Sequence, residues 1–189
     1  MSNFFKETDI DTSQAEAIVT ETLKNCDDGE LYLENHKSES IVLDDNKIKS
    51  STYNSDQGYG FRAVTGEVVA YSHSNDISKE SLRKSSENLK DTLKSKKGTY
   101  NHEIPKTNSK YYENINPIES KTFDSKIDLL NSVNNYLRSK GSIVNQVTAN
   151  FLGEHKSIEI IRSDNQVLKD DRPLVRFNVS VVLEKDGKK

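Results

Sequence analysis

Apolar residues recur at helical spacing in three stretches of the chain, and elsewhere they alternate with polar residues. The first stretch predicts a helix over residues 13–26, opened by a capping box that begins at Ser13. A second helix is expected from the capping residue Ser78, and a third from Asp124 or Ser125. The core-facing positions of the three helices are Ala15, Val19, Leu23 and Cys26; Leu82, Ser86, Leu89 and Leu93; and Ile127, Leu130, Val133 and Leu137.

Alternation with a period of two predicts short strands between and after these helices. Asp45-Asn46 and Gly66 are turn formers, so they are expected to close two hairpins. Residues 30–74 should therefore form an antiparallel meander. The predicted strands cover residues 30–34, 40–44, 47–53, 59–65, 67–72, 147–151, 158–160, 166–168 and 175–183.

The last strand has the clearest alternation of all, because Val175, Phe177 and Val179 begin an apolar row that continues to Leu183. Asp186-Gly187 follows as a hairpin signal just before the sequence stops. A hairpin turn normally leads into a partner strand, so the sequence is interpreted as cut. The isolated chain is expected to aggregate, or to dimerise, through that strand edge.

The predicted fold class is α+β, with antiparallel or mixed sheet meanders packed against helices. Residues 1–97 are expected to form an N-terminal domain, 98–122 a linker without sustained periodicity, and 123–189 the start of a second α+β unit. His36-Lys37-Ser38 aligns with His155-Lys156-Ser157, and further identities follow at the same spacing. This suggests that the two helix-plus-meander halves arose by duplication.

Composition narrows the function classes. The 189 residues carry a formal charge of −3, which gives no reason to favour a nucleic-acid partner. Acidic residues interrupt the N-terminus where a signal peptide would be apolar, and no long apolar run follows. A soluble, cytoplasmic protein without membrane contact is therefore expected. The single cysteine, Cys26, excludes an internal disulfide and is predicted to be buried.

The residues themselves nominate no catalytic centre. The histidines are far apart in sequence, and the nearest approach to a zinc-binding helix is His102-Glu103, which Pro105 would break. His36 and His155 are interpreted as surface residues at strand ends. No glycine-rich loop leads from a strand into a helix, so a nucleotide site is not expected. Residue patterns alone predict an α+β protein with no catalytic and no metal-binding residue.

Two separated segments carry a family resemblance. The run from Asp56 to Glu67, with its core Gly-Tyr-Gly-Phe-Arg at 58–62, is similar to the signature of the TldD branch of the TldD/PmbA family. Ser163-Asp164 and the segment from Asp171 to Gly187 resemble the strand before that family's catalytic region. The resemblance runs in the same order from about residue 10 to the end of the chain.

The resemblance implies a longer zinc metallopeptidase that acts on unfolded or leader-type peptides together with a PmbA (TldE) partner subunit. In that family an HExxxH helix holds the zinc, and its Glu acts as general base. The present sequence contains no HExxxH motif, so no catalytic or zinc residue is carried over and no cofactor is expected on it. It is expected to be inactive alone.

Gly58, Gly60 and Arg62 are the candidate site residues within the family-like run. They could shape a substrate cleft, or the glycines could serve a turn or bulge while Arg62 makes a structural ion pair. The alternative to an enzyme segment is a free-standing scaffold module that captures a peptide or a partner chain on a strand edge. DNA or gyrase binding is a third reading, which the charge opposes.

Overall fold

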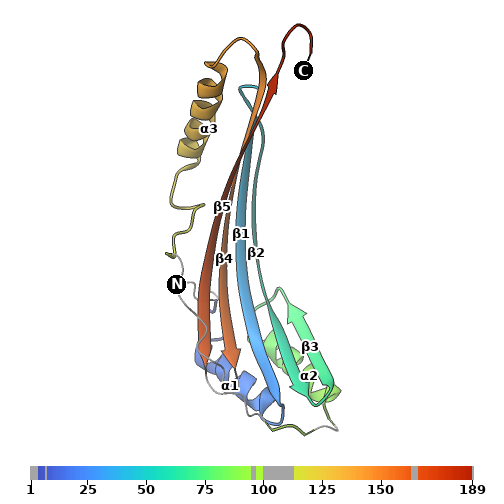
Figure 1. Ribbon diagram of the computed structural model, residues 1–189. Coiled ribbons are helices and arrows are strands. Elements are labelled where there is room, and N and C mark those ends of the chain that lie inside the picture. The colour runs from blue at the N-terminus through green and yellow to red at the C-terminus, as the bar shows by residue number, and fades with distance from the viewer. Residues whose placement is uncertain (1–3, 7, 95–96, 100–112, 163–165, 189) are drawn as a thin grey trace. The chain divides into compact units, whose positions relative to one another are not determined.

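A computed structural model of the chain describes residues 4–6, 8–94, 97–99, 113–162 and 166–188. The helices and strands in chain order are α1 (Thr12–Leu23), β1 (Asp28–Asp44), β2 (Lys47–Thr65), β3 (Val68–Ser74), α2 (Lys79–Thr92), α3 (Phe123–Arg138), β4 (Val144–Arg162) and β5 (Val167–Leu183). The strands form one antiparallel sheet in the order β3-β2-β1-β4-β5 (Figure 1). The α+β fold class and the meander over residues 30–74 are confirmed.

The residues cluster into two compact units, and each unit takes several stretches of the chain. Unit 1 comprises Met1–Asn35, Asp56–Glu113 and Ser157–Asp171. Unit 2 comprises His36–Ser55, Asn114–Lys156 and Arg172–Lys189. Residues 100–112 of the predicted linker, which include His102, lie outside the described residues, as does the family-like Ser163-Asp164. The proposed duplication stays a prediction.

Unit 1 has a closed apolar core beneath α1 and α2. Leu31, Phe61 and Ala63 point from the sheet into this core and are fully buried. Hydrogen bonds between hydroxyl groups connect α2 to α1 and to β2. Thr22 of α1 shares a 2.6 Å hydrogen bond with Ser86, and the Tyr59 hydroxyl of β2 shares one of 2.8 Å with that of Ser85. Because these buried hydroxyls are paired with one another, they carry little desolvation cost.

Unit 2 is built around α3 and a smaller apolar cluster of Ile41, Leu43, Leu130, Ala149 and Phe151. A charged pair lies at its centre, because the Lys126 ammonium contacts the Glu39 carboxylate and both side chains are almost fully buried. The same ammonium donates a 2.6 Å hydrogen bond to a main-chain carbonyl, that of Ile118. These contacts offset the desolvation cost of burying the two charges.

The strands are longer than the sequence pattern predicted. Each of four long strands joins two segments that were expected to be separate strands. The joined segments are 30–34 and 40–44 in β1, 47–53 and 59–65 in β2, 147–151 and 158–160 in β4, and 166–168 and 175–183 in β5. Separate strands were therefore the wrong interpretation. The intervening residues 35–38 are polar and partly buried, and Glu39 is buried against Lys126. Main-chain ladder bonds hold this segment in the sheet although it has no apolar face.

The start of α1 also differs from the prediction. Asp11, not Ser13, is the N-cap: its carboxylate accepts a 2.8 Å hydrogen bond from the Gln14 amide N–H, and the Gln14 side chain accepts one from the Asp11 N–H. Asp and Ser cap equally well, so the sequence offered two starts of similar strength. The Ser78 cap of α2 and the burial of Cys26 are confirmed, whereas α3 starts slightly earlier, after Thr122.

Candidate functional site

Arg62 lies near the middle of the sheet face that unit 1 turns away from its helices. Its neighbours Phe61 and Ala63 point into the core, so strand alternation sends Arg62 to the opposite face. Opposite it on β3 is Tyr71, and Gly60 pairs with His73. We call this surface the outer face: Arg62 and Gly60 on β2, Tyr71 and His73 on β3, Asp28 and Glu30 on β1, and Arg162 on β4.

Two carboxylates hold the Arg62 guanidinium. Its Nε and Nη2 atoms each donate a 2.7 Å hydrogen bond to a different oxygen of Glu30, and Nη2 also donates one of 2.6 Å to Asp28. Arg162 donates a 2.8 Å hydrogen bond to the other Asp28 oxygen. The four side chains therefore link β2, β1 and β4 across the outer face. Bidentate geometry fixes the guanidinium plane more firmly than a single contact would.

The electrostatics of this cluster favour its charged state. Burial acts to raise the pKa of Asp28, but the hydrogen bond and charge of Arg62, together with the charge of Arg162, outweigh it and lower that pKa below its usual value. The hydrogen bond to Glu30 leads the effects that raise the pKa of Arg62 above its ordinary range. Both shifts favour the charged forms, so the ion pairs of Arg62 with Asp28 and Glu30 join β2 to β1.

The two candidate glycines lie inside β2, and they differ in what surrounds them. A Cβ on Gly58 would lie 2.7 Å from the Ser74 carbonyl oxygen of the neighbouring strand, a main-chain atom that cannot give way. A Cβ on Gly60 would meet the tip of the Tyr71 side chain at 2.6 Å. That ring can move. Gly58 thus allows a close approach between strands, and Gly60 makes room for Tyr71 on the outer face.

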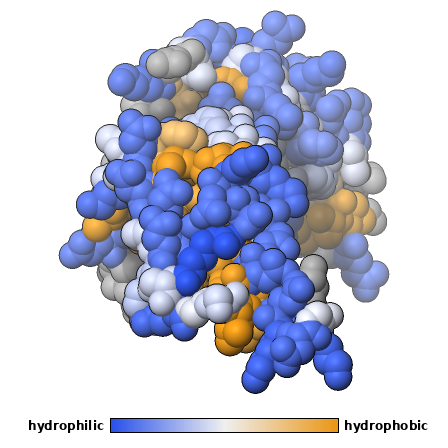
Figure 2. Space-filling view, turned by 90° about the horizontal axis from the view of Figure 1, so that it is seen from above, coloured by the Kyte–Doolittle hydropathy of each residue, from blue (hydrophilic) through white to orange (hydrophobic). Residues whose placement is uncertain are grey.

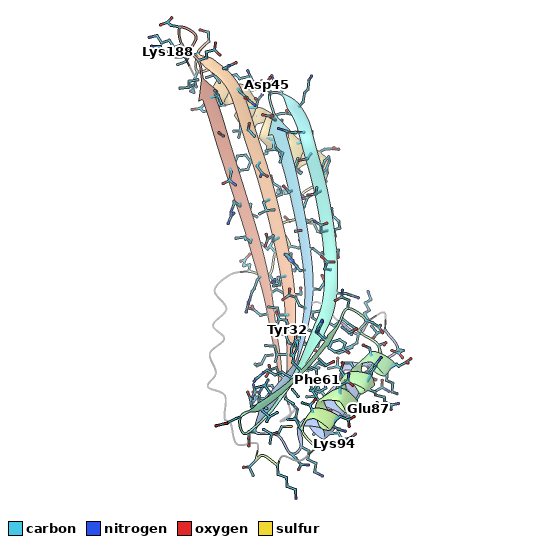
Figure 3. All side chains as sticks on the ribbon, turned by 90° about the vertical axis from the view of Figure 1, so that its right-hand side faces the viewer. Tyr32, Asp45, Phe61, Glu87, Lys94 and Lys188 are labelled. Atoms are coloured by element: carbon cyan, nitrogen blue, oxygen red, sulfur yellow. The ribbon has the colours of Figure 1, made fainter. Side chains whose placement is uncertain are left out.

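Exposed aromatic side chains accompany the charged cluster. Tyr71 is 64% exposed and stacks on His73 with ring centroids 5.8 Å apart. On β1, the Tyr32 hydroxyl donates a 2.5 Å hydrogen bond to Glu34, and Figure 3 shows where Tyr32 and the buried Phe61 lie. The outer face therefore offers exposed aromatic side chains next to paired charges, and aromatic residues and Arg are enriched at protein interfaces.

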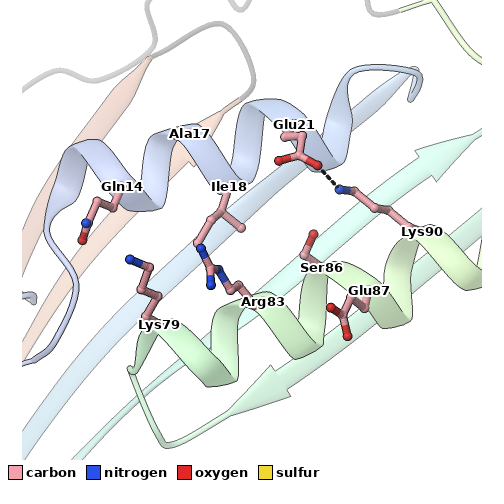
Figure 4. A pocket seen from close by; sticks show the side chains of 9 residues that line it. All are labelled: Gln14, Ala17, Ile18, Glu21, Lys79, Arg83, Ser86, Glu87 and Lys90. Atoms are coloured by element: carbon pink, nitrogen blue, oxygen red, sulfur yellow. Dashed lines mark hydrogen bonds and ion pairs between the residues drawn. The ribbon is translucent and has the colours of Figure 1, made fainter.

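A shallow groove of about 470 Å³ lies between α1 and α2 on the other side of unit 1 (Figure 4). Arg83 and Lys79 point into it from α2, and Glu21 on α1 forms a 2.7 Å ion pair with Lys90 across it. Charges of both signs line this groove and its walls are exposed. It has neither the enclosure nor the apolar lining of a small-molecule site.

No group of three or more histidine, cysteine, aspartate or glutamate side chains that could hold a metal occurs among the described residues. His36 lies 3.6 Å from Glu154, and His155 shares a 3.2 Å hydrogen bond with Asn114. The described side chains thus do not fit a zinc ion, which takes three or four protein ligands. None of the described helices is long and apolar enough to cross a membrane.

Family comparison identifies the chain. A model described as "PmbA/TldA metallopeptidase domain 1" matches residues 29–94, and one described as the "PmbA/TldA metallopeptidase central domain" matches residues 116–189. The chain belongs to the PmbA/TldD family. The run around Gly58, Gly60 and Arg62 falls within the first of these two domains.

Relatives of this PmbA/TldD-family chain are named metalloproteases. The Metalloprotease TldD homolog of Buchnera aphidicola is 34% identical over 167 residues, which are 88% of this chain and 35% of that protein. The homolog of Haemophilus influenzae is 33% identical over 172 residues, again 88% of this chain and 35% of the relative. The chain therefore spans about a third of the length of these curated relatives.

Solved structures share the fold at low sequence identity. A putative modulator of DNA gyrase from Bacteroides thetaiotaomicron superimposes with a TM-score of 0.68 at 14% identity, covering 96% of this chain and 43% of that one. TldE from Thermococcus kodakarensis gives 0.64 at 13% identity, covering 92% and 40%. This PmbA/TldD-family fold is thus retained although most residues differ.

Sequence reasoning found Arg62 but missed its partners. Asp28, Glu30 and Arg162 become neighbours only when β1 and β4 are placed beside β2, and no spacing along the chain brings them together. One signal was available: Glu30 and Arg62 lie in predicted strands of the meander, at polar positions that alternate with apolar ones. A pairing of opposite charges across the meander could have been inferred from that.

Proposed function

We propose that this chain is the front part of a TldD-like zinc metallopeptidase that processes or degrades unfolded or leader peptides. It would shape the substrate cleft and the contact with a PmbA/TldE-like subunit, and the protein would work in the cytoplasm. The observation that carries the proposal is the match to two consecutive metallopeptidase domains of one family along most of the chain. Relatives named metalloproteases, which are about three times as long as the aligned part, support it.

In this proposal the chemistry belongs to the zinc and to an HExxxH segment that the present sequence lacks. When bound, the zinc would polarise the peptide carbonyl and activate water. The residues of this chain would bind the peptide substrate and orient it. The outer face supports such a role, because its charges are fixed by ion pairs while Tyr71 and His73 stay accessible at the edge strand β3.

Two measurements test the proposal. The purified chain should neither bind stoichiometric zinc nor cleave an unfolded peptide, and the coding DNA should continue past Lys189 into an HExxxH codon run. Zinc-dependent hydrolysis by these 189 residues alone would contradict it.

The second candidate is a stand-alone scaffold module that captures a peptide or a partner chain without catalysis. The exposed apolar row on β5 favours it. A natural stop codon directly after Lys189, combined with tight binding of an extended peptide by the isolated chain, would decide for the module.

A further inference from the structure

β3 lies at the margin of the sheet, with β2 as its neighbour in the ladder (Figure 1). It sits well inside the chain, because a two-residue turn leads into it from β2 and α2 follows it. Thr65 pairs with Val68 across that turn, so these two residues exchange hydrogen bonds. Bonded and non-bonded pairs alternate from there, and Val69, Tyr71 and His73 therefore turn their N–H and C=O groups away from β2.

This edge lacks the features that usually block an exposed strand. Residues 68–74 contain no lysine, arginine, acidic residue or proline, and their pairing with β2 runs without a bulge. Within the part of the chain that the structure describes, no main-chain hydrogen bond from another segment reaches the three outward residues. Their donors and acceptors are therefore available to an added strand.

Contacts on both faces hold β3 in place and leave its edge clear. Ala70 is buried, and the Ser72 hydroxyl shares a 2.9 Å hydrogen bond with that of Ser85 on α2. On the outer face the Tyr71 ring leans over Gly60, where a Cβ would lie 2.6 Å from the Tyr71 hydroxyl oxygen. The ring thus lies over β2 and not across the free edge of β3. Little ordering remains to be done when a ligand binds.

Exposed apolar side chains alone do not single out β3. Figure 2 shows apolar patches interrupting a largely polar face of the molecule. The distinction of β3 is that Val69, which is 58% exposed, and Tyr71, which is 64% exposed, also carry outward main-chain groups. A strand added at this edge would contact both the main chain and these side chains.

We propose that the edge of β3 binds an extended peptide as an additional antiparallel strand. Three alternate residues of the peptide would face Val69, Tyr71 and His73, and each facing pair would exchange two hydrogen bonds. The main chain of the peptide is what this edge recognises, so unfolded segments of varied sequence fit it. That the bound peptide is a substrate rests on the proposed function, whereas the binding itself does not.

The features of this edge favour a peptide over a second protein chain. Stable interfaces between proteins involve about 20–30 residues on each side, far more than a strand of this length presents. A short ladder instead suits a ligand that binds and leaves. The charges beside it are already paired, Arg62 with Asp28 and Glu30, so they impose no choice of peptide charge.

Nuclear magnetic resonance of the ¹⁵N-labelled 189-residue chain locates the binding. The probe is a capped octapeptide of alternating threonine and glutamine. The amide signals of Val69, Tyr71 and His73 should shift on titration, and exchange of their N–H protons with solvent should slow by about tenfold. Those of Val68 and Ala70 should change less, because their N–H groups already bond to β2.

N-methylated versions of the same peptide test recognition of the main chain. Methylation at alternate residues leaves one complete edge of the peptide, so the dissociation constant should change by no more than about twofold. Methylation at every residue removes all donors, and binding should weaken by about tenfold or more. The side chains are the same in all three peptides.

Val69→Pro tests the protein side of the ladder. Proline removes one outward N–H but none of the bonds to β2, and binding should weaken by about threefold, the loss expected for one hydrogen bond. Val69→Thr keeps that N–H and is the matched control, with unchanged affinity. Far-UV circular dichroism verifies that both variants fold, and if Val69→Pro does not, the methylated peptides decide.

Three results overturn the proposal: no response of residues 69–73 to the octapeptide, shifts confined to β5, or equal binding of the fully methylated peptide. None of them touches the metallopeptidase assignment, which zinc binding and the coding DNA test separately. Binding at β3 without hydrolysis is the expected result for the 189-residue chain.

Discussion

Units 1 and 2 place their apolar and charged residues in opposite ways. Unit 1 has an apolar core under two helices and carries on its outer face the ion pairs of Arg62 with Asp28 and Glu30. Unit 2 buries a charged pair, Lys126 with Glu39, beneath one helix and leaves the apolar row of β5 outside. Unit 2 thus combines a buried ion pair with an exposed apolar row, whereas the main apolar cluster of unit 1 lies beneath α1 and α2.

Removing a core phenylalanine should give the largest effect and the sharpest contrast between the units. Phe61→Ala leaves a cavity in the large core and should lower the free energy of unfolding by about 4 kcal/mol. Phe151→Ala should cost about 2 kcal/mol, because its ring lies at the margin of a small cluster that can close around the gap. Urea denaturation measures both values. Equal losses would show that the two cores are equivalent after all.

The buried charge of unit 2 provides the next test. Lys126→Met should lower the free energy of unfolding by about 3 kcal/mol, because the Glu39 carboxylate then remains buried without its partner. Replacing Glu39 by Leu as well removes the stranded charge. The double variant should recover to within about 1 kcal/mol of the original chain. A double variant as unstable as the single one would mean that the pair is needed for more than mutual neutralisation.

The outer-face cluster of unit 1 should matter less, since it is partly solvated. Arg62→Ala should lower the free energy of unfolding by about 1.5 kcal/mol, and Arg62→Lys by somewhat less, because an ammonium cannot bind Glu30 in two places. Lys90→Ala, which breaks the more exposed pair with Glu21, is the control and should change stability by less than about 0.5 kcal/mol. Equal effects for Arg62 and Lys90 would argue against a structural role for Arg62.

The smallest expected effect concerns pH. Because the folded protein lowers the pKa of Asp28, its carboxylate stabilises the fold above the pKa of the unfolded chain, about 3.9, and this contribution disappears as pH falls below that value. Comparing the original chain with Asp28→Asn should reveal a stability difference of about 1 kcal/mol at neutral pH that shrinks towards pH 3. Asp56→Asn, at an exposed position on β2, serves as the control. A difference that grows on acidification would reverse the assigned sign.

Local sequence signals predicted the elements that depend on local physics. Ser78 and the leucines after it specified α2, since a cap and a 3.6-residue stripe are properties of a short segment. Asp45-Asn46 placed a hairpin correctly, and both residues adopt positive φ there. The polar segment 35–39 was misread as a break, because its place in β1 depends on ladder bonds to other strands and not on its own side chains.

In the candidate site, too, local sequence indicated a residue, whereas contacts between distant strands decided its role. Arg62 could be singled out from its run, yet its role depends on Asp28, Glu30 and Arg162, which the sheet order alone brings together. The family could be recognised from separated segments of sequence, because related chains keep local motifs in order. The full set of contacts in this cluster depends on the strand order, which those local motifs do not encode.

By itself the sequence determined the α+β class, the Ser78 cap of α2, the hairpin turns, the burial of Cys26 and the family. Only the tertiary structure decided how far each strand runs, which charges Arg62 meets, and that Lys126 and Glu39 are buried together. The reason is physical: caps and turns are settled by neighbours within a few residues, whereas ladder bonds and ion pairs join segments that are distant along the chain.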